Sequence, residues 1–182
     1  LCLGLDFRHA GFVDRAHEAF QEVLRLDAQN RYAFVNLQKL HEDQQQWTEA
    51  ARVREQITKI DAQHREEHLQ ILGFLRNEIG SAAARTGDIA GATRSYQEAI
   101  DIDARTIPAH LNLGDSRLQQ GQIQAAIDAW ETLVRTLPDR AYLAFERLER
   151  AYRTLGAPGR FVDLCERHIA RSPQDWRGRL AL

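Results

Sequence analysis

The sequence predicts an all-α fold, a solenoid of antiparallel helix pairs in about five repeats, on the strength of three observations. The first is a 34-residue period, because Ala16 and Ala50 are 34 residues apart and so are Ala92 and Ala126. The second is a composition suited to packed helices, with 4 Pro in 182 residues and 27% charged residues. The third is that positions around the later alanines recur with the same spacing: Gly80 with Gly114, Gly87 with Gly121, Tyr96 with Trp130, and Ala104 with Pro138. Repeats of this length stack as helical hairpins.

The fourth repeat shows most plainly how small and bulky residues alternate between two paired helices. The positions that carry the pattern are Asn112, Leu113, Gly114, Gly121, Ala126, Trp130, Leu133 and Pro138. Small residues let two antiparallel helices approach closely, and bulky residues fill the space that remains. This arrangement resembles the tetratricopeptide repeat (TPR) family. The resemblance implies a right-handed superhelical solenoid whose first helices line a concave surface.

Repeats one and two keep the period closely, at about residues 1–30 and 31–64. The positions in register with the later repeats are Gly4, Phe7, Gly11, Ala16 and Phe20 in the first, and Leu37, Ala50 and Ile57 in the second. Each of these repeats is therefore expected to form one helical hairpin.

Repeat three, residues 65–106, breaks the period. Ala50 and Ala92 are 42 residues apart, so about eight extra residues lie near 65–72. Residues 64–85 contain no Pro, which indicates continued helix and not a loop. We therefore expect the first helix of this repeat to be about two turns longer than the others, at its N-terminal end.

Repeats four and five follow at about 107–140 and 141–175, and residues 176–182 are expected to begin a sixth. No Met occurs in the chain, and the pattern is already under way at Leu1. We therefore expect this sequence to be a piece of a longer protein. Cys2 and Cys165 occupy helix positions expected to face inward, so both are predicted to be buried free thiols.

The net charge and the distribution of apolar residues argue against two classes of function. A net charge of −2 argues against a strongly basic nucleic-acid-binding protein. No apolar run approaches the roughly 18 residues that a membrane span needs, so this part of the protein is not expected to contact a membrane. The expected location is cytoplasmic, at the cytoplasmic face of the inner membrane if an N-terminal anchor precedes this sequence.

The TPR resemblance also implies which residues hold a partner, because set positions of each first helix line the concave surface in that family. This partner-binding groove is expected at Tyr32, Asn36, Lys39, Phe74, Asn77, Asn112, Asp115, Arg147 and Arg150. Asn can bond a peptide backbone as donor and acceptor, and Arg can bind a carboxylate through two hydrogen bonds. A local role for the asparagines stays open, and Glu146 and Glu149 are placed to neutralise the arginines. The expected partner is a protein or peptide.

One short string offers a different chemistry. His64 and His68, with Glu67 beside the second histidine, match the H-x-x-E-H pattern of inverted zinc peptidases. The string lies in a charged helical segment, and Glu78, a downstream candidate for the third ligand, would lie roughly 20 Å from His64 along the helix. Surface or structural histidines are the favoured interpretation, and a zinc peptidase is the remote alternative.

A narrower resemblance covers residues 3–137. The short sequence motifs that carry it are, in chain order, Leu3 to Phe7, Ala10-Gly11, Asp14 to Ala16, Asn36 to Gln38 and Trp47 to Ala50, followed by the lengthened repeat before Asp88. This order resembles the bacterial lipopolysaccharide assembly protein B family (LapB, also called YciM). The resemblance implies an adaptor that holds back lipopolysaccharide synthesis by presenting the deacetylase LpxC to the membrane protease FtsH. The four cysteines of that family's zinc module are not among residues 1–182.

The sequence therefore predicts a non-catalytic scaffold that binds a partner protein and needs no cofactor or metal. A carboxylate clamp of the co-chaperone kind is disfavoured, because Leu1 and Leu5 stand where that clamp has Lys and Asn. Two alternatives stay open: a general TPR binding module with another partner, and a self-assembly module. Self-assembly would use apolar residues near the two ends of the sequence, namely Leu3, Phe7, Leu180 and Leu182.

Overall fold

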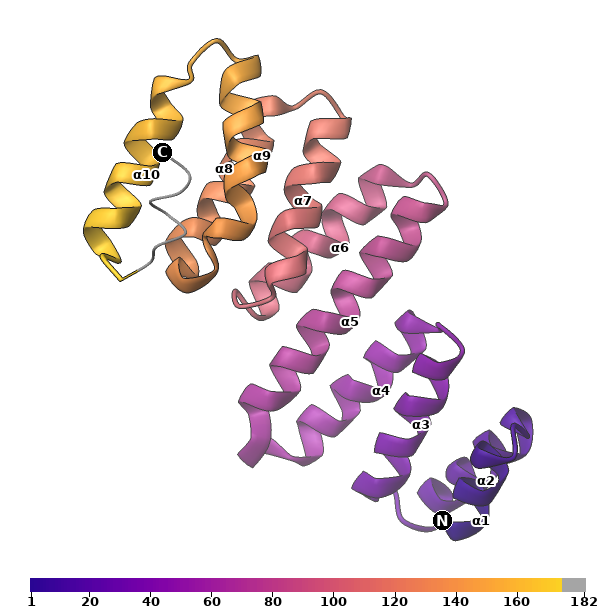
Figure 1. Ribbon diagram of the computed structural model, residues 1–182. Coiled ribbons are helices and arrows are strands. Elements are labelled where there is room, and N and C mark those ends of the chain that lie inside the picture. The colour runs from indigo at the N-terminus through magenta and orange to yellow at the C-terminus, as the bar shows by residue number, and fades with distance from the viewer. Residues whose placement is uncertain (175–182) are drawn as a thin grey trace. The chain divides into compact units, whose positions relative to one another are not determined.

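The structure is a computed structural model that describes residues 1–174, and over this range it contains ten α-helices and no strand (Figure 1). The helices follow one another as five pairs: α1 (Cys2–His9) and α2 (Val13–Leu26), α3 (Arg31–Asp43) and α4 (Trp47–Ile60), α5 (Arg65–Arg85) and α6 (Ile89–Ile102), α7 (Ile107–Gln119) and α8 (Ile123–Thr136), α9 (Tyr142–Thr154) and α10 (Gly159–Arg171). Short 3₁₀ turns, Ala62–His64 and Pro138–Arg140, precede α5 and α9. The predicted all-α fold of about five helix pairs is confirmed. The expected start of a sixth repeat, with Leu180 and Leu182, lies outside the described residues.

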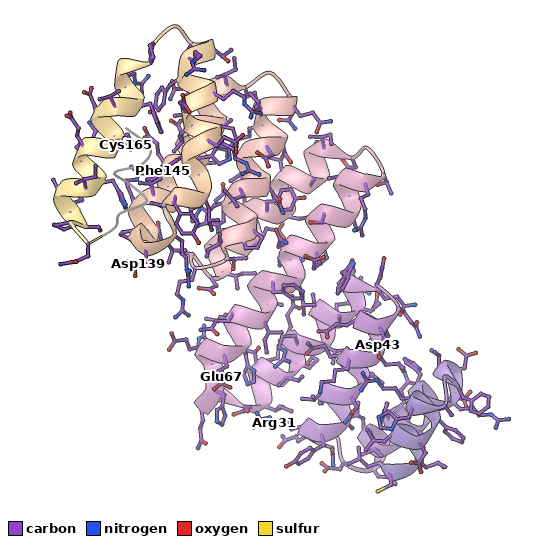
Figure 2. All side chains as sticks on the ribbon, in the orientation of Figure 1. Arg31, Asp43, Glu67, Asp139, Phe145 and Cys165 are labelled. Atoms are coloured by element: carbon purple, nitrogen blue, oxygen red, sulfur yellow. The ribbon has the colours of Figure 1, made fainter. Side chains whose placement is uncertain are left out.

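The chain forms two compact units, an N-terminal unit, Leu1–Ile79, and a C-terminal unit, Gly80–Leu182. The core of the N-terminal unit contains Ala16, Phe20, Leu37 and Leu40 from α2 and α3. A larger cluster in the C-terminal unit joins α8, α9 and α10 around Trp130, Leu133, Phe145, Leu148, Phe161 and Cys165. The side chains of Phe145 and Cys165 are labelled in Figure 2.

Helix α5 has the extra length predicted from the interrupted period. It contains 21 residues, whereas α3 and α7, the first helices of the neighbouring pairs, contain 13 each. The eight additional residues correspond to about two turns. Glu66 and Glu67 lie in its first turn, where negative charge interacts favourably with the helix dipole. The lengthened helix is therefore confirmed.

Three glycines explain how closely the paired helices approach. A Cβ atom built on Gly4 would lie 2.6 Å from the Phe20 ring, and one on Gly80 would lie 2.6 Å from the Tyr96 ring. The closest approach is at Gly114, where a Cβ atom would lie 2.1 Å from the indole nitrogen of Trp130. The small residue of one helix thus makes room for the ring of its partner, as the repeat pattern indicates.

The turn inside the second helix pair differs from the other four. Those four turns contain a glycine at positive φ, for example Gly121 at 75°, whereas the second pair has Gln45 at 57°. A left-handed conformation is costly for a residue with a Cβ atom. The packing of α3 on α4 therefore maintains a turn that its own sequence does not favour.

The two cysteines differ in environment. Cys165 is buried as predicted, but Cys2 is exposed, so the prediction for Cys2 was wrong. Cys2 is the first residue of α1, a helix in which Gly4 is the one buried residue. Leu3, beside it, is 59% exposed as well.

We predict that one thiol per chain reacts quickly with Ellman's reagent at pH 8 and that this thiol is Cys2. Burial, with a contribution from the charge of Glu149, raises the pKa of Cys165 to about 11. Only about one Cys165 in a thousand is then a thiolate at pH 8, and the thiolate is the reactive form. The Cys2→Ser variant should lose the fast phase and Cys165→Ser should keep it. Fast labelling of Cys2→Ser would contradict the burial of Cys165.

Candidate functional site

A cavity of 370 Å³ opens between α7 and α9 in the C-terminal unit. We call it the α7–α9 groove, and its lining residues are Asp115, Leu118, Trp130, Glu146, Arg147, Arg150, Ala151 and Thr154. Both α7 and α9 are first helices of their pairs, which is where the sequence predicts a binding surface. Trp130 reaches the groove from α8.

The floor of the α7–α9 groove is apolar and rigid. Trp130 is fully buried, and its indole nitrogen donates a hydrogen bond to the carbonyl oxygen of Leu111 at 3.2 Å. The absence of a side chain on Gly114 leaves the space that the indole ring occupies. Leu118, which is 39% exposed, and Ala151 complete the apolar part of the lining. A partner side chain that enters here meets a surface that is already ordered.

The rim of the groove is charged but internally neutralised. Arg147 on α9 binds Asp115 on α7 through two hydrogen bonds, 2.8 Å from Nε to Oδ1 and 3.0 Å from Nη2 to Oδ2. The hydrogen bond that Arg147 donates to Asp115 is the main reason that the pKa of Arg147 is raised above its usual value. Arg150 donates to Glu146 at 2.7 Å. Each rim cation therefore has a carboxylate partner from within the chain.

Three of the nine predicted groove residues, Asp115, Arg147 and Arg150, line this cavity together. Asn112 lies one turn before Asp115 on α7 and is half-buried. Five lining residues were not predicted for the groove: Trp130 and Glu146 were noted only for packing and for charge neutralisation, and Leu118, Ala151 and Thr154 were not noted at all. Helical spacing offered a signal for the last three, since they follow Asp115 and Arg147 at intervals of three, four and seven residues.

The other five predicted groove residues belong to the N-terminal unit. Tyr32 and Lys39 are exposed, and Asn36 donates to the carbonyl oxygen of Tyr32 at 2.8 Å. Phe74 packs edge to face on the ring of Trp47, with 6.4 Å between centroids. Asn77 is only 3% exposed and donates to Glu78 at 3.0 Å. None of these five side chains lines the α7–α9 groove.

The two histidines of the H-x-x-E-H string have different environments. His64 is partly exposed, and its Nδ1 lies 2.9 Å from Asp61. His68 is 2% exposed; its Nδ1 lies 3.0 Å from Nη1 of Arg54, and its Nε2 lies 3.3 Å from Asp61. A guanidinium can only donate, so Nδ1 of His68 accepts and its proton is on Nε2, facing Asp61.

Asp61 connects α4, α3 and α5 in the N-terminal unit. Arg31, labelled in Figure 2, forms an ion pair with it at 2.7 Å. The hydrogen bond from His64 is the largest reason that the pKa of Asp61 lies below its usual value, and Arg31 and His68 lower it further. Nδ1 of His68 thus has a hydrogen-bond partner within the chain and its Nε2 lies close to Asp61, an arrangement that fits a structural role for this histidine. Among residues 1–174, no group of three or more His, Cys, Asp or Glu is arranged to hold a metal ion.

Within residues 1–174, every helix is too short or too polar to cross a lipid bilayer.

Two crystal structures are similar to this chain in fold. A crystal structure of MamA has a TM-score of 0.54 at 20% identity, covering 96% of this chain and 91% of that chain. A crystal structure of YrrB has a TM-score of 0.50 at 15% identity, covering 98% and 87%.

A curated relative is the probable UDP-N-acetylglucosamine--peptide N-acetylglucosaminyltransferase SPINDLY of Hordeum vulgare, 24% identical over 117 residues. The alignment covers 64% of this chain but only 12% of that protein. The family model described as "Tetratricopeptide repeat" matches residues 2–63 and 111–175. These two segments make up more than half of the sequence, so the chain belongs to the tetratricopeptide repeat family.

Proposed function

We propose that this chain is a protein-interaction scaffold that binds an extended segment of a partner protein in the α7–α9 groove. TPR repeats are generally non-catalytic modules for protein–protein contact, and YrrB is described as a TPR protein with an unusual peptide-binding site. The observation that carries the proposal is the convergence of Asp115, Arg147 and Arg150 around one 370 Å³ cavity with an apolar floor.

The lining of the groove indicates what kind of segment fits. Leu118 presents apolar surface above the buried Trp130 and Ala151, so the cavity suits a bulky aliphatic or aromatic side chain. The carboxylate and guanidinium groups at the rim can accept from and donate to peptide amides on either side of that side chain. Because the rim charges are already paired, we propose that the groove recognises shape and apolar character more than net charge.

Selection of peptides from a randomised phage-displayed library against the purified chain tests this proposal. The selected peptides should carry a large apolar residue, and the Leu118→Glu variant should bind them at least about tenfold more weakly, because it replaces the exposed apolar side chain of the lining with a charged one. Val162→Glu is the matched control, since Val162 is 43% exposed on α10 and does not line the groove. Equal binding by Leu118→Glu and the native chain would refute the groove assignment.

A narrower role rests on the resemblance to LapB, in particular on the order of its short sequence motifs and on the 21-residue helix α5. In that role the chain is the repeat portion of an adaptor that brings LpxC to FtsH. Direct titration of the chain with purified LpxC, and separately with the soluble part of FtsH, decides between this adaptor and a TPR module with another partner.

A further inference from the structure

We propose that the C-terminal unit has a second binding site, which takes an acidic segment of a partner protein between α8 and α10. A cavity of 250 Å³ lies between these two second helices. We call it the α8–α10 cleft, and its lining residues are Glu131, Val134, Arg135, Pro138, Leu164, Arg167, His168 and Arg171. It shares no lining residue with the α7–α9 groove and goes beyond the function proposed above.

Unpaired positive charge distinguishes the cleft. Within residues 1–174, none of its three arginines, Arg135, Arg167 and Arg171, lies within ion-pair distance of a carboxylate. Arg135 donates only to the hydroxyl group of Thr132, at 2.9 Å. The arginines of the groove differ in this respect, since each has a carboxylate partner at 2.7 to 2.8 Å.

Glu131 contributes the one carboxylate found among the described lining residues, and it is already engaged. It accepts a hydrogen bond from the hydroxyl group of Tyr152. Burial, followed by this contact with Glu131, raises the pKa of Tyr152 to about 12, so the tyrosine keeps its proton at neutral pH. Three guanidinium groups therefore face one carboxylate, which leaves a positive potential that an acidic ligand would balance.

The spacing of the arginines favours a row of carboxylates over one compact anion. Arg167 and Arg171 are four residues apart on α10, which separates them by about 6 Å along the helix axis. Arg135 comes from α8, on the other side of the cleft. Val134, Leu164 and Pro138 supply apolar surface between the cations. This alternation suits a peptide in which Asp or Glu residues are interspersed with apolar ones.

Other anionic macromolecules fit less well. The chain has a net charge of −2, and the cleft has no aromatic side chain in its lining apart from His168, which is 4% exposed. Nucleic-acid sites combine a strongly basic surface with exposed rings on which bases stack. A peptide is therefore the ligand to which the residues point.

The test uses a fluorescein-labelled peptide of about 12 residues in which glutamates alternate with pairs of leucine and glycine, titrated with the full chain and followed by fluorescence anisotropy. The Arg135→Gln, Arg167→Gln, Arg171→Gln triple variant should bind at least about tenfold more weakly. Single exposed ion pairs contribute at most about 1 kcal/mol, so three must be removed together for a clear effect. Native binding should also weaken as salt is raised, since these charges are exposed.

The matched control is the triple variant Arg25→Gln, Arg52→Gln, Arg153→Gln, which loses the same three charges at exposed, ion-paired positions outside both cavities. It should bind the acidic peptide nearly as tightly as the native chain. An equal loss in the two variants, or no native binding at millimolar peptide, would overturn the proposal. Displacement of the peptide by micromolar pyrophosphate would also overturn the proposal, because it would show that the cleft binds phosphate groups in preference to an acidic peptide. The Leu118→Glu variant should keep its affinity for the acidic peptide, so failure at one cavity is distinguishable from failure at the other.

Discussion

Replacing Trp130 with alanine is expected to lower the free energy of unfolding of the C-terminal unit by about 3–5 kcal/mol. Trp130 is fully buried, belongs to the largest apolar cluster of that unit, and donates a hydrogen bond to the carbonyl oxygen of Leu111. Its removal leaves a cavity beneath α7 that the neighbouring backbone cannot close without moving. Urea unfolding followed by circular dichroism measures the change through the midpoint, provided that the slope of the transition is unchanged.

The partner of this tryptophan provides a more discriminating experiment. Alanine usually stabilises a helix by about 1 kcal/mol relative to glycine, but Gly114→Ala should instead destabilise by about 1–3 kcal/mol through overpacking against the indole ring. Gly159→Ala is the matched control, because Gly159 also lies in a helix and no atom is within 4 Å of its built Cβ. It should be neutral or stabilising. A stabilising effect of Gly114→Ala would show that the tight fit around Trp130 is wrong.

The second large effect is expected in the N-terminal unit, where His68→Leu should cost about 3 kcal/mol. Arg54 is 7% exposed, and burial is the main reason that its pKa lies below the usual value. In the variant its Nη1 loses the acceptor that it has at 3.0 Å. Loss of the partner of a buried charged group leaves the full desolvation cost of that group uncompensated.

The neighbouring histidine supplies the control for this measurement. His64→Leu removes a partner of the same carboxylate, Asp61, but from a side chain that is 43% exposed. Exposed pairs contribute at most about 1 kcal/mol, so the expected change is well below that for His68→Leu. Similar losses in the two variants would argue against a buried link through Arg54. Thermal or urea unfolding of both variants measures the two changes in the free energy of unfolding. Added zinc is not expected to alter either of them.

The repeat period predicted the helices well because it records contacts that every helix pair makes. Gly114 and Trp130 fill equivalent positions to Gly80 and Tyr96, so their packing could be anticipated without coordinates. The extra turns of α5 followed from the same reasoning, since additional residues that contain no Pro are expected to extend the helix and not to form a loop. Local pattern and tertiary packing agree at these positions.

Features that occur once in the chain could not be anticipated in the same way. The contact of His68 with Arg54 depends on how the extra turns of α5 meet α4, and no other repeat contains an equivalent pair. Cys2 is exposed although its position within the repeat suggests burial. The pairing of Arg147 with Asp115 spans two repeats, and the sequence alone placed Arg147 nearer to the glutamates of its own helix.

The pairing of charges around the α7–α9 groove has a consequence for how two partners could be held at once. An apolar floor with a neutralised rim gains little from attraction between net charges, so its occupancy should respond weakly to ionic strength. The α8–α10 cleft, with three unpaired guanidinium groups, should respond strongly. A rise in salt would then release an acidic partner while an apolar one stays bound. The occupancy of the two cavities would thereby change independently: that of the groove would depend on the shape of the partner's side chain, and that of the cleft on the salt concentration.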